Sequence, residues 1–204
     1  MFEEKVFSLQ LTYNPYYAPR TREACIHAAS RHIPPPTKAG VLSRLKMDAE
    51  SNISSPNVEA LTDVSRDIQY YAEVEIGSNE QKFRLNFDTG SSDLWVPDSA
   101  CKTTQAKFDK TQSKTFQTVK GKFQIGYGDG SRVQGVLGQD TVYVAGLKIE
   151  NQVFGIATRL STSFSNDVID GILGLGYNTI ACVPGTKTVM DNLIEQKLIK
   201  EPIF

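Results

Sequence analysis

The sequence predicts a mostly β fold, a single lobe of antiparallel strands with one or two short helices. Apolar and polar residues alternate along residues 71–76 and again along residues 82–87, which is the period of strands with one buried face. Further strand-like runs lie at residues 123–125 and 141–144, and glycines separate the runs from one another. One late helix is expected, with an apolar face that consists of Val189, Met190, Leu193, Ile194 and Leu198.

Residues 1–56 differ in character from the rest of the chain, and we expect them to form a separate segment. A strand is expected at Val6–Leu11 and a short helix at residues 21–29, which a run of three prolines ends. Residues 37–56 are polar and weakly patterned, as in a linker or a cleavable loop. The segment carries 7 Lys and Arg against 5 Asp and Glu, whereas residues 57–204 carry 15 against 18, so the two parts have opposite net charge.

The composition of the 204-residue chain argues against several classes of function. Its net charge of −1 provides no dominant basic surface for nucleic acid, and no run of about 18 apolar residues could form a membrane helix. The first residues, MFEEK, are acidic where a signal peptide is basic, so no signal peptide is visible. The three cysteines, Cys25, Cys101 and Cys182, contain no C-x-x-C pair, which argues against a metal site and a disulfide scaffold and leaves room for one bridge.

Histidine is confined to the beginning of the chain, at His27 and His32. The rest of the chain therefore lacks the residue on which Ser-His-Asp, Cys-His and His-x-x-x-His zinc chemistry depends. If the main domain is hydrolytic, carboxylates are the expected catalytic groups.

Residues 85–95, LNFDTGSSDLW, carry the strongest chemical signal. An apolar strand delivers Asp88 to a tight turn of small residues, in which Gly90 allows the backbone to fold closely under the carboxylate. Thr89 and Ser91 offer hydroxyl and N–H groups that can hold this carboxylate in its ionised form. The alternative is an ordinary exposed Asp-Thr-Gly turn, and the stretch by itself leaves both interpretations open.

Two further segments strengthen the first interpretation. Residues 125–131, IGYGDGS, indicate a hairpin with Tyr127 near its tip, and we expect this hairpin, over 123–137, to project over Asp88. Residues 168–176, VIDGILGLG, indicate a buried strand with glycines where backbones pass closely. Taken singly, these segments are also compatible with an ordinary hairpin and a glycine-rich core strand.

In order, spacing and local sequence, the three segments resemble pepsin-like aspartic endopeptidases, most closely the fungal rhizopuspepsin-like enzymes, over about residues 67–204. The resemblance implies a pepsin-like lobe and a catalytic loop made of Asp88, the first catalytic aspartate, with Thr89, Gly90 and Ser91 in support. It also implies a set of positions that contact substrate, namely Tyr127, Gly128 and Asp129 of the flap, with Trp95 as the partner of the flap tyrosine.

The same resemblance implies how the chain is organised. Residues 1–56 correspond to a propeptide and linker, and residues 57–204 to the N-terminal catalytic lobe. In zymogens of this kind a Lys-Tyr pair plugs the active site, and here Arg31-His32 stands in its place. Members of the family use two aspartates, one per lobe. This sequence holds one Asp-Thr-Gly and no Asp-Ser-Gly, so we expect the C-terminal lobe to be absent.

The resulting expectation is an aspartic-type endopeptidase without metal or cofactor, represented here by a truncated, zymogen-like chain. Its expected partners are a peptide or protein substrate and its own propeptide, with no nucleic acid and no membrane, and its expected location is secreted or vacuolar. Two alternatives stay open: a catalytically inactive lobe that binds or inhibits peptides, and a half-enzyme that is active only as a homodimer.

Overall fold

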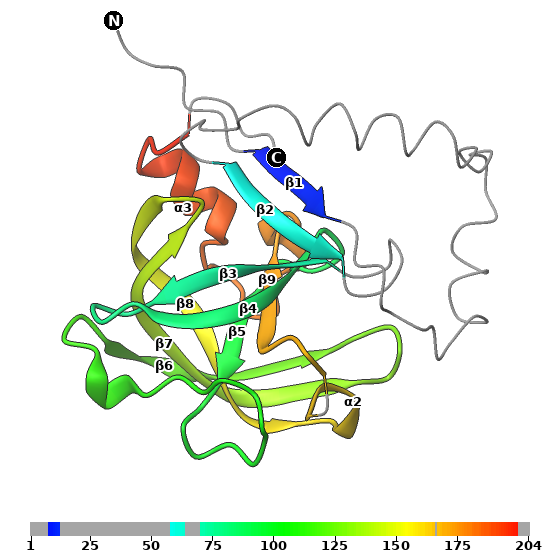
Figure 1. Ribbon diagram of the computed structural model, residues 1–204. Helices are drawn as coiled ribbons and strands as arrows, with labels where there is room; N and C mark the ends of the chain where they lie inside the picture. The colour runs from blue at the N-terminus through cyan, green and yellow to red at the C-terminus, as the bar shows by residue number, and fades with distance from the viewer. Residues whose placement is uncertain (1–7, 13–57, 64–69, 166, 200–204) are drawn as a thin grey trace, which may run out of the picture.

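The computed structural model describes residues 8–12, 58–63, 70–165 and 167–199. Most of these residues lie in one nine-stranded sheet with the order β1-β2-β3-β4-β9-β5-β8-β7-β6, and an extra β3–β7 pairing bends the sheet toward closure (Figure 1). The strands are β1 (Ser8–Thr12), β2 (Val58–Asp63), β3 (Tyr70–Ile76), β4 (Gln81–Asp88), β5 (Leu94–Pro97), β6 (Gln117–Gly126), β7 (Arg132–Val144), β8 (Leu147–Leu160) and β9 (Gly171–Gly174).

The mostly β fold expected from the sequence is confirmed, and the sheet is mixed in direction. Among the described strands, β1–β2, β4–β9 and β5–β8 pair in parallel, and the other six pairings are antiparallel. Parallel neighbours need long connections, and β4 is separated from β9 by about half of the lobe's sequence. Alternation along single strands carries no information on such distant pairing, which is why the sequence indicated only antiparallel neighbours.

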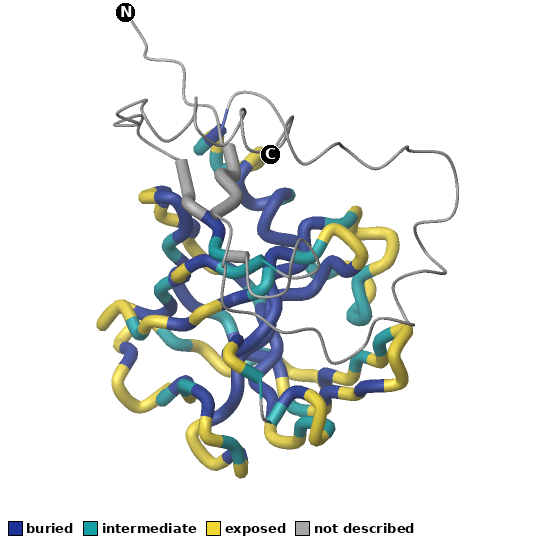
Figure 2. Tube along the Cα trace, turned by 45° about the vertical axis from the view of Figure 1, so that its right-hand side comes forward, coloured by how far each residue is buried: buried dark blue, intermediate teal, exposed yellow. Residues whose placement is uncertain are grey.

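The strand faces predicted from alternation are those that the structure buries. Ala72, Val74 and Ile76 of β3 point into the core, and so do the alternate apolar residues of β4. A second apolar cluster, around Trp95 and Phe123, lies beneath the hairpin of β6 and β7. Figure 2 shows the buried residues in the interior of the lobe and the exposed ones along its loops and hairpin ends.

The late helix is present as α3 (Val189–Glu195), and one residue of its predicted apolar face is wrongly assigned. Thr188 and Asp191 form a capping box at its start, in which each side chain accepts the other's backbone N–H. Ile194 is 47% exposed, and Asn192 is buried instead, where it donates to Gln152 on β8. In the last turn of α3 the buried positions are therefore Asn192 and Leu193, and Ile194 lies on the solvent side.

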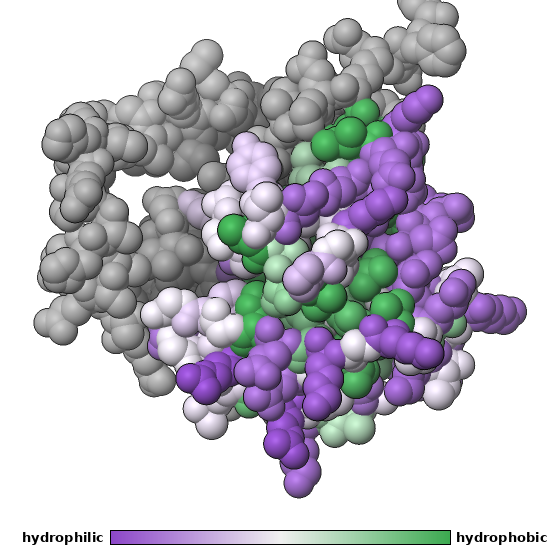
Figure 3. Space-filling view, turned by 180° about the vertical axis from the view of Figure 1, so that it is seen from behind, coloured by the Kyte–Doolittle hydropathy of each residue, from purple (hydrophilic) through white to green (hydrophobic). Residues whose placement is uncertain are grey.

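Three shorter helical pieces complete the described part: the 3₁₀ turns η1 (Lys110–Gln112) and η2 (Asn178–Ile180), and the four-residue helix α2 (Thr162–Ser165). No helix among the described residues has the length and apolar character to cross a membrane. Seen from behind, most of the coloured surface is hydrophilic, with smaller apolar areas between the polar residues (Figure 3).

Of the strand expected at Val6–Leu11, residues 8–11 are observed in β1, which also includes Thr12, and residues 6 and 7 lie outside the described residues. Strand β1 forms an edge of the sheet beside β2, with Ser8 opposite Val58 and Thr12 opposite Thr62. The expected helix at 21–29, the Arg31-His32 pair and the linker at 37–56 lie outside the described residues.

Candidate active site

Asp88 is the last residue of β4, and the parallel strand β9 fixes its position. The two strands are in register, with Asp88 opposite Gly174, and the N–H of Leu175 donates to the Asp88 carbonyl at 2.8 Å. Gly174 has to be glycine, because a Cβ atom there would lie 2.5 Å from the backbone N of Asp93. The backbones of the loop after Asp88 and of β9 therefore hold each other in place, as the glycine pattern of residues 168–176 predicted.

The carboxylate of Asp88 is held by the turn that follows it. The N–H of Gly90 donates to Oδ1 at 2.9 Å, and the hydroxyl of Ser91 donates to Oδ2 at 2.6 Å. Thr89 was expected to support the carboxylate as well, but within the described part of the chain its exposed side chain contributes no hydrogen bond to it. These two donors keep the orientation of the half-buried carboxylate fixed.

The hairpin of β6 and β7 ends in a glycine-rich turn, residues 126–131, which we call the flap. Tyr127 and Ser131 close the turn, since the N–H of Tyr127 donates to the Ser131 carbonyl at 2.9 Å. At the tip a Cβ atom on Gly128 would meet nothing within 4 Å, so the backbone there is open to a ligand. The Ser131 hydroxyl and N–H donate to Oδ1 of Asp129, and the hydroxyl in particular lowers the pKa of Asp129 below its usual value.

Trp95 connects the flap to the body of the lobe. Its side chain is fully buried, and its Nε1–H donates to the Tyr127 hydroxyl at 2.7 Å. The edge of Phe164 packs against both rings, with centroid distances of 5.2 Å to Trp95 and 5.5 Å to Tyr127. Burial raises the pKa of the Tyr127 hydroxyl, and the nearby Asp88 carboxylate raises it further, so Tyr127 is a neutral hydroxyl close to Asp88.

Two contributors to this arrangement carry no signal in the sequence. Phe164 belongs to α2, a helix too short to show a period, and Cys182 lies 89 positions after its partner Asp93. The backbone N–H and the thiol of Cys182 both donate to Oδ2 of Asp93 at 2.9 Å. Burial and this anionic acceptor raise the pKa of Cys182 to about 12, so the thiol stays protonated. Asp93 thereby connects the loop between β4 and β5 to the segment after β9.

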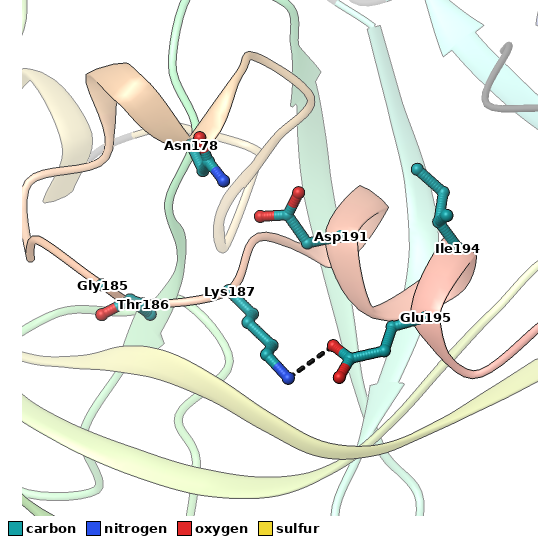
Figure 4. Close-up of a pocket in the computed structure, with 7 residues that line it drawn as sticks. All are labelled: Asn178, Gly185, Thr186, Lys187, Asp191, Ile194 and Glu195. Atoms are coloured by element: carbon teal, nitrogen blue, oxygen red, sulfur yellow. Dashed lines mark ion pairs between the residues drawn. The ribbon is translucent and has the colours of Figure 1, made fainter.

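Two large hollows in the described part of the chain lie away from Asp88. One, of about 480 Å³, adjoins α3, and its lining includes Asn178, Asp191 and Ile194, with an ion pair between Lys187 and Glu195 beside it (Figure 4). The Asp191 carboxylate there is occupied by the capping box. Within the same described residues, no group of three or more His, Cys, Asp or Glu side chains is arranged to hold a metal ion.

Comparison with known proteins connects this geometry to a family. Residues 69–204 match the family model of eukaryotic aspartyl proteases. The chain is 45% identical to syncephapepsin of Syncephalastrum racemosum over 96% of its own length, and 39% identical to rhizopuspepsin of Rhizopus chinensis over 98%. It is 40% identical to cathepsin E of Rattus norvegicus over 77% of its length. These matches cover 49%, 50% and 39% of the respective relatives, so the chain spans about half the length of the fungal proteins it resembles.

Proposed function

Because this chain belongs to the eukaryotic aspartyl protease family, we propose that it supplies Asp88 as one of the two catalytic carboxylates of an aspartic-type endopeptidase. The observation that carries the proposal is the Asp88 carboxylate itself, which Gly90 and Ser91 orient at the end of β4 with the Tyr127 hydroxyl nearby. The substrate would be a peptide or protein that lies between this carboxylate and the flap.

The chemistry requires a general base and a general acid in contact with the same water and the same peptide bond. One ionised carboxylate removes a proton from the water, which attacks the carbonyl carbon, while a second, protonated carboxyl group donates a proton to the carbonyl oxygen. In this scheme Asp88, whose carboxylate is oriented by the Gly90 and Ser91 donors, takes the role of base. The 204 residues contain one Asp-Thr-Gly and no Asp-Ser-Gly, so the second carboxyl group has to come from elsewhere.

Fusion to a matched second half tests this proposal directly. A chimera that joins this chain to the part of syncephapepsin that it does not match should cleave peptides at pH 3–5 and be inhibited by pepstatin; we call it the syncephapepsin chimera. Replacing Asp88 by Asn in the chimera should lower kcat/KM by at least about 10³-fold, because the base is lost while the shape is kept. A folded chimera without activity, or an Asp88→Asn variant that keeps it, would refute the proposal.

The flap also suggests which side chains the enzyme accepts before the scissile bond. Asp129 resembles the flap aspartate of fungal relatives that accept Lys there as well as large apolar residues, and its Oδ2 is free of the contacts that Ser131 makes with Oδ1. In the chimera, Asp129→Thr and the isosteric Asp129→Asn should both lower kcat/KM for Lys substrates by about 10-fold and leave Phe substrates unchanged.

The pH dependence of this preference follows from the lowered pKa of Asp129. A carboxylate with a depressed pKa keeps its charge when the pH falls below the usual range of an aspartate, near 3.9. The preference for Lys should therefore persist at pH 3.5, where an aspartate with the usual pKa has lost more than half of its charge. An equal loss on Lys and Phe substrates, or a preference that disappears between pH 5 and pH 3.5, would contradict the assignment.

We further propose that residues 1–56 act as a propeptide of a secreted or vacuolar enzyme. The support from the structure is β1, a strand from this segment that pairs with the edge of the lobe's sheet instead of standing alone. The net charge of the segment is opposite in sign to that of residues 57–204, which favours docking.

A further inference from the structure

We propose that Ser161 is a positioning residue that fastens helix α2 to the flap hairpin and thereby sets where Tyr127 rests on Trp95 and Phe164. The proposal deepens the proposed function, because it concerns the resting position of the flap. Its evidence is a set of contacts at the point where β8 ends and α2 begins.

Ser161 forms hydrogen bonds with both the N–H and the carbonyl group of Arg132, the first residue of β7 after the flap. The N–H of Arg132 donates to the Ser161 hydroxyl at 2.8 Å. The Arg132 carbonyl accepts from the Ser161 N–H at 3.0 Å and from the Ser161 hydroxyl at 3.1 Å. The serine thus adds one more rung to the β7–β8 pairing, beyond the last strand partners, Val133 and Leu160.

The same residue is the start of α2. Its carbonyl accepts from the N–H groups of Phe164, at 3.0 Å, and Ser165, at 3.2 Å. A serine before a helix normally uses its hydroxyl to accept from an N–H of the first helical turn. Here the hydroxyl is bound to Arg132 instead, so Ser161 joins the helix to the flap strand.

The connection forms a closed path around the flap. Arg132 is connected to Tyr127 through the turn of the flap. Arg132 is also hydrogen-bonded to Ser161, which leads into α2 and to Phe164 (Figure 1). The two ends meet where Phe164 packs on Tyr127 and on Trp95, which donates to the Tyr127 hydroxyl. Because Ser161 connects α2 to the hairpin, the Phe164 ring is held in a fixed position relative to Tyr127. Removing the Ser161 hydroxyl should allow Phe164 to move relative to Tyr127.

Trp95 is the single tryptophan of the chain, and its indole N–H is the donor in the contact with Tyr127. One indole signal in a ¹H–¹⁵N spectrum of the 204-residue chain therefore reports the state of the flap without any need for catalysis. In Ser161→Ala the Trp95 indole N–H should exchange with solvent about fivefold faster, the size expected for the loss of one net hydrogen bond. Ser161→Thr, which keeps a hydroxyl, should restore the slow exchange.

The matched control is Thr158→Val. It removes a hydroxyl that also donates to a β7 carbonyl, that of Gln134 at 3.3 Å, but takes no part in α2. This variant should leave the indole exchange unchanged, and the backbone amide of Ile172, deep in the sheet, should keep its protection in all variants. Should Ser161→Ala fail to fold, Ser161→Val and Ser161→Thr, which are isosteric with each other, provide the same comparison.

An indole exchange rate in Ser161→Ala equal to that of the wild type or of Thr158→Val would overturn the proposal, as would faster exchange that Ser161→Thr does not restore. The outcome is separate from that of the proposed function. A syncephapepsin chimera without peptidase activity would refute the catalytic role and leave the indole measurement valid.

Discussion

Residues 1–204 alone should hydrolyse a peptide at pH 3–5 at least about 10⁴-fold more slowly than the syncephapepsin chimera, in terms of kcat/KM. The isolated chain can provide Asp88 as a base, but a single carboxyl group cannot remove the proton of the water and protonate the carbonyl oxygen in the same step. General acid assistance is typically worth about 10²–10⁴-fold, and the substrate also loses contacts that would position it. The measurement is fluorogenic peptide cleavage with equal concentrations of the two proteins after removal of residues 1–56.

A homodimer could in principle supply the second carboxylate from another copy of Asp88, related by a two-fold axis. Such activity would increase with the square of the protein concentration, be inhibited by pepstatin and disappear in Asp88→Asn. That combination would show an active half-enzyme and contradict the expected inactivity. Activity that increases linearly with concentration and survives Asp88→Asn would be a contaminating protease.

Local sequence was sufficient for those features whose determinants are close together in the chain. The alternation of apolar and polar residues in 71–76 and 82–87 predicted which faces of β3 and β4 are buried, because a strand with one buried face has a period of two residues. The turn after Asp88 was predictable in part: Ser91, three residues away, donates as expected, whereas the second donor is the Gly90 N–H and not Thr89. The contact between Trp95 and Tyr127, 32 positions apart, was implied only by the family resemblance.

Features that depend on distant segments could not be predicted in this way. The parallel pairing of β4 with β9 and the contact of Asp93 with Cys182 join residues more than 80 positions apart. Nothing near Phe164 marks it as the ring beneath Tyr127, because α2 has four residues and no period. Ile194 was assigned to the core because it is apolar, whereas the polar Asn192 is buried in that turn, where it donates to Gln152, 40 positions away in the chain.

Replacing Asp170 by alanine should destabilise the lobe by about 2–4 kcal/mol, because it removes a buried carboxylate that accepts from two backbone N–H groups and pairs with the half-exposed Arg84 guanidinium. Asp170 is 2% exposed and lies just before β9. Its carboxylate accepts from the N–H of Arg84 at 2.8 Å and from the N–H of Ala106 at 2.9 Å, and the Arg84 guanidinium donates to both of its oxygens at 3.3 Å. Alanine would leave the two N–H groups without an acceptor and Arg84 without its partner.

Urea denaturation of the 204-residue chain, followed by Trp95 fluorescence and circular dichroism, measures this loss. The matched control is Lys82→Ala, since the Lys82–Glu73 pair joins the same sheet across β3 and β4 but is exposed to solvent. That variant should leave the denaturation midpoint almost unchanged, whereas Asp170→Asn, which keeps one acceptor oxygen, should fall between the control and Asp170→Ala. An Asp170→Ala midpoint close to that of Lys82→Ala would mean that β9 is anchored beneath Asp88 mainly by its packing and its backbone pairing with β4.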